Sequence, residues 1–135
     1  MKKKLKNEKG QAMVEFALVL PILLFVVCGI IDFGWLFFNQ LSLDNACREG
    51  ARYAAICSSE DDCIAMVETH IDNIIAPVFD DVEISITYTD LSDKLNGDVV
   101  VNLEAEMKIL TPVLGAINRG QTKILTSEVV MKVET

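Results

Sequence analysis

Residues 16–38 read FALVLPILLFVVCGIIDFGWLFF, and Asp32 is the single charged side chain in this run of 23 residues. At about 1.5 Å of rise per residue, a helix of this length extends roughly 35 Å, which exceeds the hydrocarbon thickness of a bilayer, about 30 Å. A helix that packs in a soluble core keeps a polar stripe, and none is present between Phe16 and Ile31. The run therefore predicts a transmembrane helix in contact with membrane lipid.

Charge is distributed unevenly around this run. Residues 1–10 contain five lysines and one glutamate, residues 11–38 contain only Glu15 and Asp32 as charged residues, and residues 39–135 contain seven basic and seventeen acidic side chains. Cationic flanks are retained on the cytoplasmic side of a membrane. We therefore expect a single-pass protein with a cytoplasmic leader (1–10), a transmembrane helix (11–38) and an extracytoplasmic domain (39–135). A domain this acidic repels phosphate backbones, which disfavours nucleic-acid binding.

A carboxylate, Glu15, lies at the very start of the apolar run. Such a charge costs about 2.5–3.5 kcal/mol at mid-bilayer and less near the interface. Cleavage after Gly10 would give Gln11 an α-amine one helical turn from Glu15 and on the same face. The carboxylate would then pair with that amine, or with the amine of a neighbouring subunit, and the pairing would set the depth at which subunits assemble. The alternative is that Glu15 sits in the headgroup region of an uncleaved anchor.

A family resemblance begins at the same glycine. Residues 10–55, GQAMVEFALVLPILLFVVCGIIDFGWLFFNQLSLDNACREGARYAA, resemble the N-terminal segment of the TadE family, the minor pilins or pseudopilins of the bacterial tight-adherence (Flp pilus) system. The likeness is carried, in order, by Glu15 to Leu18, Pro21, Gly29 to Gly34, and Ala46 to Ala54. The start of the segment resembles the class III leader of type IV pilin-like proteins, which a prepilin peptidase cleaves just after the glycine. Gln11 stands where many type IV pilins carry Phe.

The resemblance implies a structural subunit rather than an enzyme. It implies a precursor in the bacterial cytoplasmic membrane that is cut between Gly10 and Gln11, uses Glu15 and Phe16 for assembly and registration, and enters a surface pilus that serves adhesion. The implied partners are the prepilin peptidase, other Tad/Flp pilus subunits and minor pilins. A type II secretion pseudopilin and an uncleaved single-pass anchor displaying a small binding domain are the alternatives. The sequence has no Gly-rich phosphate loop and no nucleophile elbow, so neither catalytic residues nor cofactors are expected.

Two residues inside the run carry further expectations. Pro21 removes one backbone hydrogen bond and predicts a kink in the first half of the span. Asp32 lies 17 residues beyond Glu15, about 25 Å along a helix axis, so it reaches the outer headgroups while Glu15 stays near the inner ones. A specific intersubunit contact of Asp32 is the alternative. Trp35 follows as an interfacial aromatic residue, which predicts that the chain leaves the bilayer near Asn39.

Beyond the span, small apolar residues continue at helical spacing, in the order Leu43, Cys47, Gly50 and Ala54. They predict a single helix from about Ala12 to Ile56, half in the membrane and half in the domain, with a face that another element can approach closely. A second helix is expected over about 64–75, ended by Pro77.

The pattern then changes to a period of two over residues 82–89, 99–109 and 125–133, which predicts three strands with one apolar face each. Asp93–Asp98 predict a turn, and residues 111–120, with one proline and two glycines, predict a loop that is either a contact surface or a plain connection. The predicted fold class is α+β: a long N-terminal helix, a second short helix and a three-stranded antiparallel sheet.

The cysteines and the single histidine complete the candidate sites. Cys57 and Cys63 bound an acidic loop, where a disulfide can persist outside the membrane; two reduced thiols are the alternative. Cys47 is then the odd cysteine, either buried or reacting between chains. No CxxC pair is present, so a metal site is not expected. His70 lacks a catalytic constellation and is expected to face solvent.

Overall fold

The computed structural model describes residues 5–57, 62–75, 77–89, 97–117 and 120–133. Its elements are, in chain order, α1 (Leu5–Ile56), α2 (Cys63–Ile74), β1 (Phe79–Tyr88), β2 (Asp98–Lys108), α3 (Pro112–Ile117) and β3 (Thr122–Lys132). The three strands form one antiparallel sheet in the order β1-β2-β3. The predicted α+β fold class is confirmed.

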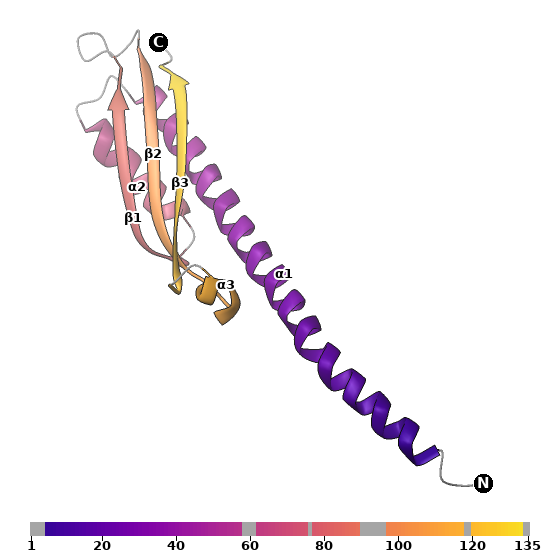
Figure 1. The fold of residues 1–135 in the computed structure, drawn as a ribbon. Helices are drawn as coiled ribbons and strands as arrows, with labels where there is room; N and C mark the ends of the chain where they lie inside the picture. The colour runs from indigo at the N-terminus through magenta and orange to yellow at the C-terminus, as the bar shows by residue number, and fades with distance from the viewer. Residues whose placement is uncertain (1–4, 58–61, 76, 90–96, 118–119, 134–135) are drawn as a thin grey trace.

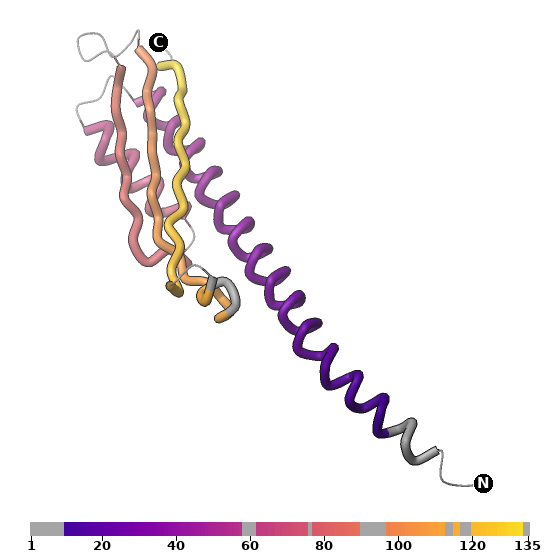
Figure 2. The backbone as a smooth tube through the Cα atoms, viewed as in Figure 1, coloured from indigo at the N-terminus to yellow at the C-terminus, as the bar shows by residue number. Residues whose placement is uncertain are grey.

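α1 is a long rod, and the other described helices and strands cover only its C-terminal half (Figures 1 and 2). The sheet and α2 both pack on this half, while the N-terminal half projects away from the domain. β3 ends at the far end of the domain, opposite the free end of the rod. The molecule therefore consists of a small two-layer domain and a bare helical stem.

The beginning of α1 differs from the prediction and its end does not. The helix starts at Leu5 instead of near Ala12 and ends at Ile56 as predicted. The earlier start has a local cause, because residues 5–9 are mostly good helix formers. The helix also continues without interruption through Gly10 and Pro21.

The small-residue face of α1 is the centre of the core, as its spacing predicts. Leu43, Cys47, Ala51 and Ala54 are all completely buried. At Gly50 the approach is closest: a Cβ atom placed there would lie 2.6 Å from Cδ1 and 2.8 Å from Cγ1 of Ile71 in α2. The absence of a side chain at this position lets α2 pack directly on the α1 backbone.

The sheet presents one apolar face to α1. Alternate residues of β2, namely Val99, Val101, Leu103, Ala105 and Met107, are buried, and their neighbours point to the outer face. The strands begin one to three residues earlier than predicted, and β1 has a register shift between Phe79 and Asp81. Thr89 and Asp98 pair through backbone and side chain at the end of the β1–β2 hairpin.

Of the two predicted connections between strands, one contains a short helix and the other lies mostly outside the described residues. Residues 112–117 form the short helix α3, where the sequence predicts a loop. The prediction failed because α3 has a proline at its start and a glycine inside, which are typical of a turn. Of the turn predicted over 93–98, only Gly97 and Asp98 fall within the described residues.

Candidate functional site

The predicted processing and registration residues lie together on the stem. Gly10, Gln11, Glu15 and Phe16 are all exposed. The Gln11 side-chain amide donates a hydrogen bond to Glu15 Oε1 at 3.3 Å, one helical turn away. The structure thus brings Gln11 and Glu15 together, and the chain with residues 1–10 attached gives this carboxylate a neutral partner.

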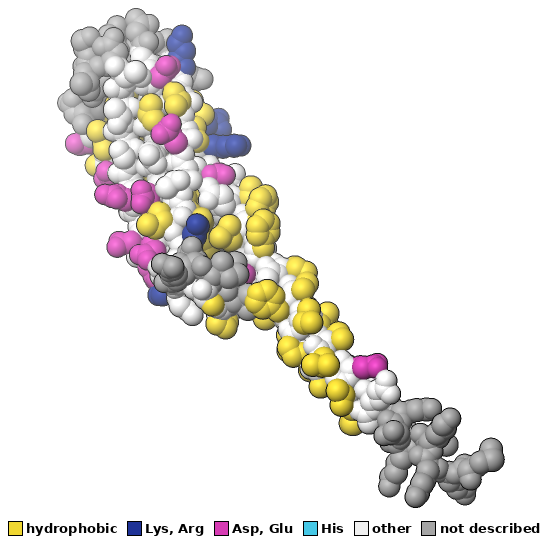
Figure 3. Space-filling view, viewed as in Figure 1, with side chains coloured by type: hydrophobic (Ala, Val, Ile, Leu, Met, Phe, Trp, Pro, Cys, Tyr) yellow, Lys and Arg dark blue, Asp and Glu magenta, His cyan; other side chains and the backbone are white. Residues whose placement is uncertain are grey.

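The stem between Glu15 and the domain is covered with apolar side chains (Figure 3). Every residue of 10–27 is exposed, including bulky ones such as Phe16, Leu18 and Ile22, each about two-thirds exposed. α1 is long and apolar enough to cross a membrane, and its most apolar window makes no burying contact with the described domain. An apolar surface of this extent requires an apolar partner outside the chain.

Asp32 marks the point where the stem meets the domain. Its side chain is 1% exposed, and its carboxylate accepts hydrogen bonds from the backbone N–H of Thr111, at 2.8 Å, and from the Thr111 hydroxyl. The sequence predicted only a headgroup position or an intersubunit contact and missed this partner within the chain. The domain therefore contacts α1 inside the predicted span of 11–38, at a residue six positions before the end of that span.

The next turns of α1 add polar contacts to the sheet. The Trp35 indole N–H donates to the carbonyl oxygen of Lys108 at 3.3 Å, and the Gln40 amide donates to the carbonyl oxygen of Thr126 at 3.0 Å. Asn39 is completely buried and donates to the Trp35 carbonyl at 2.7 Å. Trp35, which the sequence assigns to the membrane exit, thus also joins α1 to the sheet, as does Gln40.

The cysteine pair closes the other end of the domain. Cys57 and Cys63 form a disulfide that joins the end of α1 to the start of α2. The Tyr88 hydroxyl lies 3.3 Å from Cys63 Sγ and donates to the Ala54 carbonyl at 3.2 Å, and burial raises the pKa of Tyr88. Cys47 is completely buried, and its thiol donates to the carbonyl oxygen of Val101 at 3.2 Å. Of its two predicted roles, the buried one agrees with the structure.

The prediction that His70 faces solvent is wrong. Its ring is half-buried and stacks on Tyr53 of α1, with ring centroids 4.9 Å apart, and its Nε2 atom is shielded from solvent. The prediction failed because the helical pattern of α2 does not reveal an aromatic partner on another helix.

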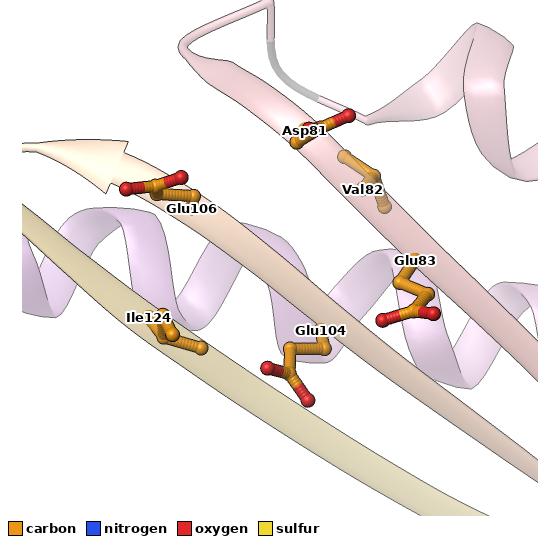
Figure 4. A pocket seen from close by; sticks show the side chains of 6 residues that line it. All are labelled: Asp81, Val82, Glu83, Glu104, Glu106 and Ile124. Atoms are coloured by element: carbon orange, nitrogen blue, oxygen red, sulfur yellow. The ribbon is translucent and has the colours of Figure 1, made fainter.

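The outer face of the sheet carries an acidic depression that the sequence did not indicate (Figure 4). In the β1–β2 register, Asp81 lies opposite Glu106 and Glu83 lies opposite Glu104, and these residues line a hollow of about 430 Å³. Like charges directly opposite each other destabilise a sheet and concentrate negative potential. Within the described ranges, no group of three or more His, Cys, Asp or Glu side chains is arranged to hold a metal ion.

One comparison with known proteins gave a match. A family model described as TadE-like protein matches residues 10–52, which form the stem and the first part of its domain half. Neither the curated proteins nor the solved structures gave a match to the chain.

Proposed function

Through residues 10–52 the chain matches the TadE-like family, and from this premise we propose that it is a membrane-anchored minor pilin or pseudopilin of a Flp/Tad-type pilus. In this role it is a structural subunit and not an enzyme. It is the substrate of a prepilin peptidase, which removes residues 1–10. The stem then serves first as a membrane anchor and afterwards as the surface through which the subunit joins other pilus subunits and minor pilins.

The observation that carries the proposal is the bare apolar stem with one acid at its start. Its exposed side chains match a lipid or subunit environment, and Glu15 is the one charged residue between Gly10 and Asp32. Cleavage at Gly10 would leave the new α-amine of Gln11 one helical turn from the Glu15 carboxylate, and the hydrogen bond between these two side chains supports their proximity. The lysines of residues 1–10 favour a cytoplasmic leader and an extracytoplasmic domain.

A second candidate, the uncleaved single-pass anchor, is favoured by one specific observation. α1 runs without a break from Leu5 through the cleavage site at Gly10, so a peptidase has to unwind this turn before it can cut. In this reading, Gln11 is the permanent partner of Glu15 and the domain remains at the membrane surface.

Intact-mass measurement of the membrane-bound protein, from cells with and without the prepilin peptidase, separates the two candidates. We expect a chain that begins at Gln11 in the first strain and a chain that retains its leader in the second. A retained leader in both strains contradicts processing and leaves the anchor.

A matched pair of variants tests the role of the glycine. A Cβ at Gly10 or at Gly34 would meet nothing within 4 Å, so both positions accept a side chain without changing the fold. Gly10→Val is expected to block removal of the leader, whereas Gly34→Val is expected to be processed like the native chain. Equal processing of the two variants would show that Gly10 does not position the cut.

A further inference from the structure

The connection between β2 and β3 is apolar where it meets α1. Residues 109–117 contain no charged side chain, and Thr111 is the one polar side chain among them. Leu110 is 59% exposed, and Pro112 and Ala116 are exposed as well. An acidic domain that presents an uncharged apolar segment beside its membrane stem needs an apolar environment for that segment.

The backbone of this connection is provided with partners from within the chain. The Thr111 N–H and hydroxyl both donate to the Asp32 carboxylate, and the N–H of Gly120 donates to the carbonyl oxygen of Gly115 at 3.2 Å. Lipid offers no hydrogen-bonding groups in its hydrocarbon region, so a segment that enters it has to satisfy its own. Asp32 thus gives the residue that precedes α3 a hydrogen-bond acceptor for its backbone N–H and for its hydroxyl.

The depth of Asp32 follows from helix geometry. Seventeen residues separate it from Glu15, which corresponds to about 25 Å, whereas a hydrocarbon core of about 30 Å needs about 20 residues and extends to Trp35. With Glu15 at the inner boundary of the hydrocarbon core, Asp32 lies about 5 Å inside the outer boundary, which is deeper than the headgroup position expected from the sequence, and any tilt of the helix places it deeper still. Because Thr111 is bonded to Asp32, the connection lies at the same depth.

We propose that residues 110–117, including α3, lie in the outer leaflet of the membrane and give the protein a second lipid contact beside α1. This inference rests on the membrane anchoring proposed above. Phe33, Phe37 and Phe38 of α1 are each more than half exposed just above Asp32, where interfacial aromatic side chains are favoured. Two contacts at different places around the stem fix the rotation of the subunit about its own axis, which a single helix does not do.

Tryptophan quenching by brominated lipid tests this depth in the full chain. Trp35 is the only tryptophan, so Trp35→Phe provides a silent background. Leu110→Trp is made in this Trp35→Phe background. Val130→Trp, on the sheet, is the matched control, because Leu110 and Val130 are almost equally exposed, at 59% and 57%. Ile30→Trp, on the stem, is the control for membrane insertion.

The variants are reconstituted in vesicles of phosphatidylcholine that carries bromine on its acyl chains. This lipid has no net charge, which avoids repulsion from Asp81 and Glu106 at the same end of the sheet. We expect Leu110→Trp to lose fluorescence to an extent comparable with Ile30→Trp and Val130→Trp to lose none. Quenching of Ile30→Trp alone overturns the inference and leaves the anchor intact. If none of the three tryptophan variants is quenched, both the lipid contact of residues 110–117 and the membrane anchoring by α1 are overturned.

Discussion

The two halves of α1 are one continuous helix with opposite relations to solvent. Residues 10–31 expose large apolar side chains, whereas the half that follows Asp32 buries small ones against the sheet and α2. Small residues suit a partner that approaches closely within the same chain, and large exposed ones suit lipid or a neighbouring subunit. The second half of α1 is therefore suited to packing within this domain, and the partner of the first half lies outside the described domain.

The strongest way to test this division is at the start of the stem. Glu15→Gln removes the charge, and we expect incorporation into fibres to fall roughly 10- to 100-fold, since a charge-assisted hydrogen bond contributes about 1.5–3 kcal/mol. Membrane insertion is expected to persist, because Gln costs less than Glu in lipid. Quantifying the subunit in sheared fibres and in membranes measures both effects.

Glu49→Gln is the control for this experiment, because Glu49 is an exposed acid on the domain half of the same helix. It is expected to assemble like the native chain. Normal assembly of Glu15→Gln would show that the stem needs no charge to find its partner.

The second test acts on the boundary between the halves. Asp32→Ala leaves the Thr111 N–H and hydroxyl without their carboxylate acceptor, and we expect a loss of about 2–3 kcal/mol in the free energy of unfolding of the domain. The full chain in detergent, unfolded by urea and followed by circular dichroism, gives this value.

A double-mutant cycle isolates the contact from other effects of removing Asp32. In a Thr111→Ala background, Asp32→Ala is expected to cost clearly less than it does alone, because one of the two donors is already gone. If the two losses simply add, the Thr111 hydroxyl contributes nothing to the contact with Asp32.

The sequence predicts the elements of this fold well where the pattern is long and local. The 3.6-residue spacing of Leu43, Cys47, Gly50 and Ala54 located the buried face of α1, and period-two alternation located all three strands. Such patterns are reliable because each residue reports the environment of its own element.

The features that the sequence did not reveal depend on contacts between distant residues. α3 is too short to show a period, and Asp32, which binds the residue before this helix, lies 79 positions from it in the sequence. The stacking of His70 on Tyr53 and the pairing of Glu83 with Glu104 likewise follow from packing and register. Alternation shows which face a residue occupies but not which residue lies opposite.

The domain half can be tested by comparing two glycines of α1. Gly50→Ala forces a Cβ against the buried Ile71, and we expect a loss of about 1–3 kcal/mol from overpacking. Gly34→Ala meets nothing within 4 Å and is expected to leave the stability unchanged or to raise it by less than about 1 kcal/mol. Urea unfolding of both variants measures the difference, and equal stabilities would mean that α2 packs less closely on α1 than described here.

The smallest effect is expected at alkaline pH and involves the buried acids of the domain half. Burial raises the pKa of the Cys47 thiol above its ordinary value of 9.0 and that of Tyr88 above 10.0. Over the pH range between the ordinary and the folded-state pKa, each group keeps its proton in the folded chain while the unfolded chain loses it. The contribution of each group to stability is therefore full below the ordinary pKa and falls as the pH rises toward the folded-state pKa. The slope of this decline approaches about 1.4 kcal/mol per pH unit for one proton.

Urea unfolding between about pH 8 and about pH 11 checks this sign. We expect the free energy of unfolding to decline from near pH 9 in the protein that keeps Cys47, and from near pH 10 in Cys47→Ala, where Tyr88 alone of the two groups remains. Both proteins carry Cys28→Ala, so that no thiolate on the stem attacks the disulfide. The exposed stem residues 10–27 include no buried acid of this kind. A decline with the same onset in both proteins would therefore mean that the Cys47 thiol is not held protonated by the packing of α1 on the sheet.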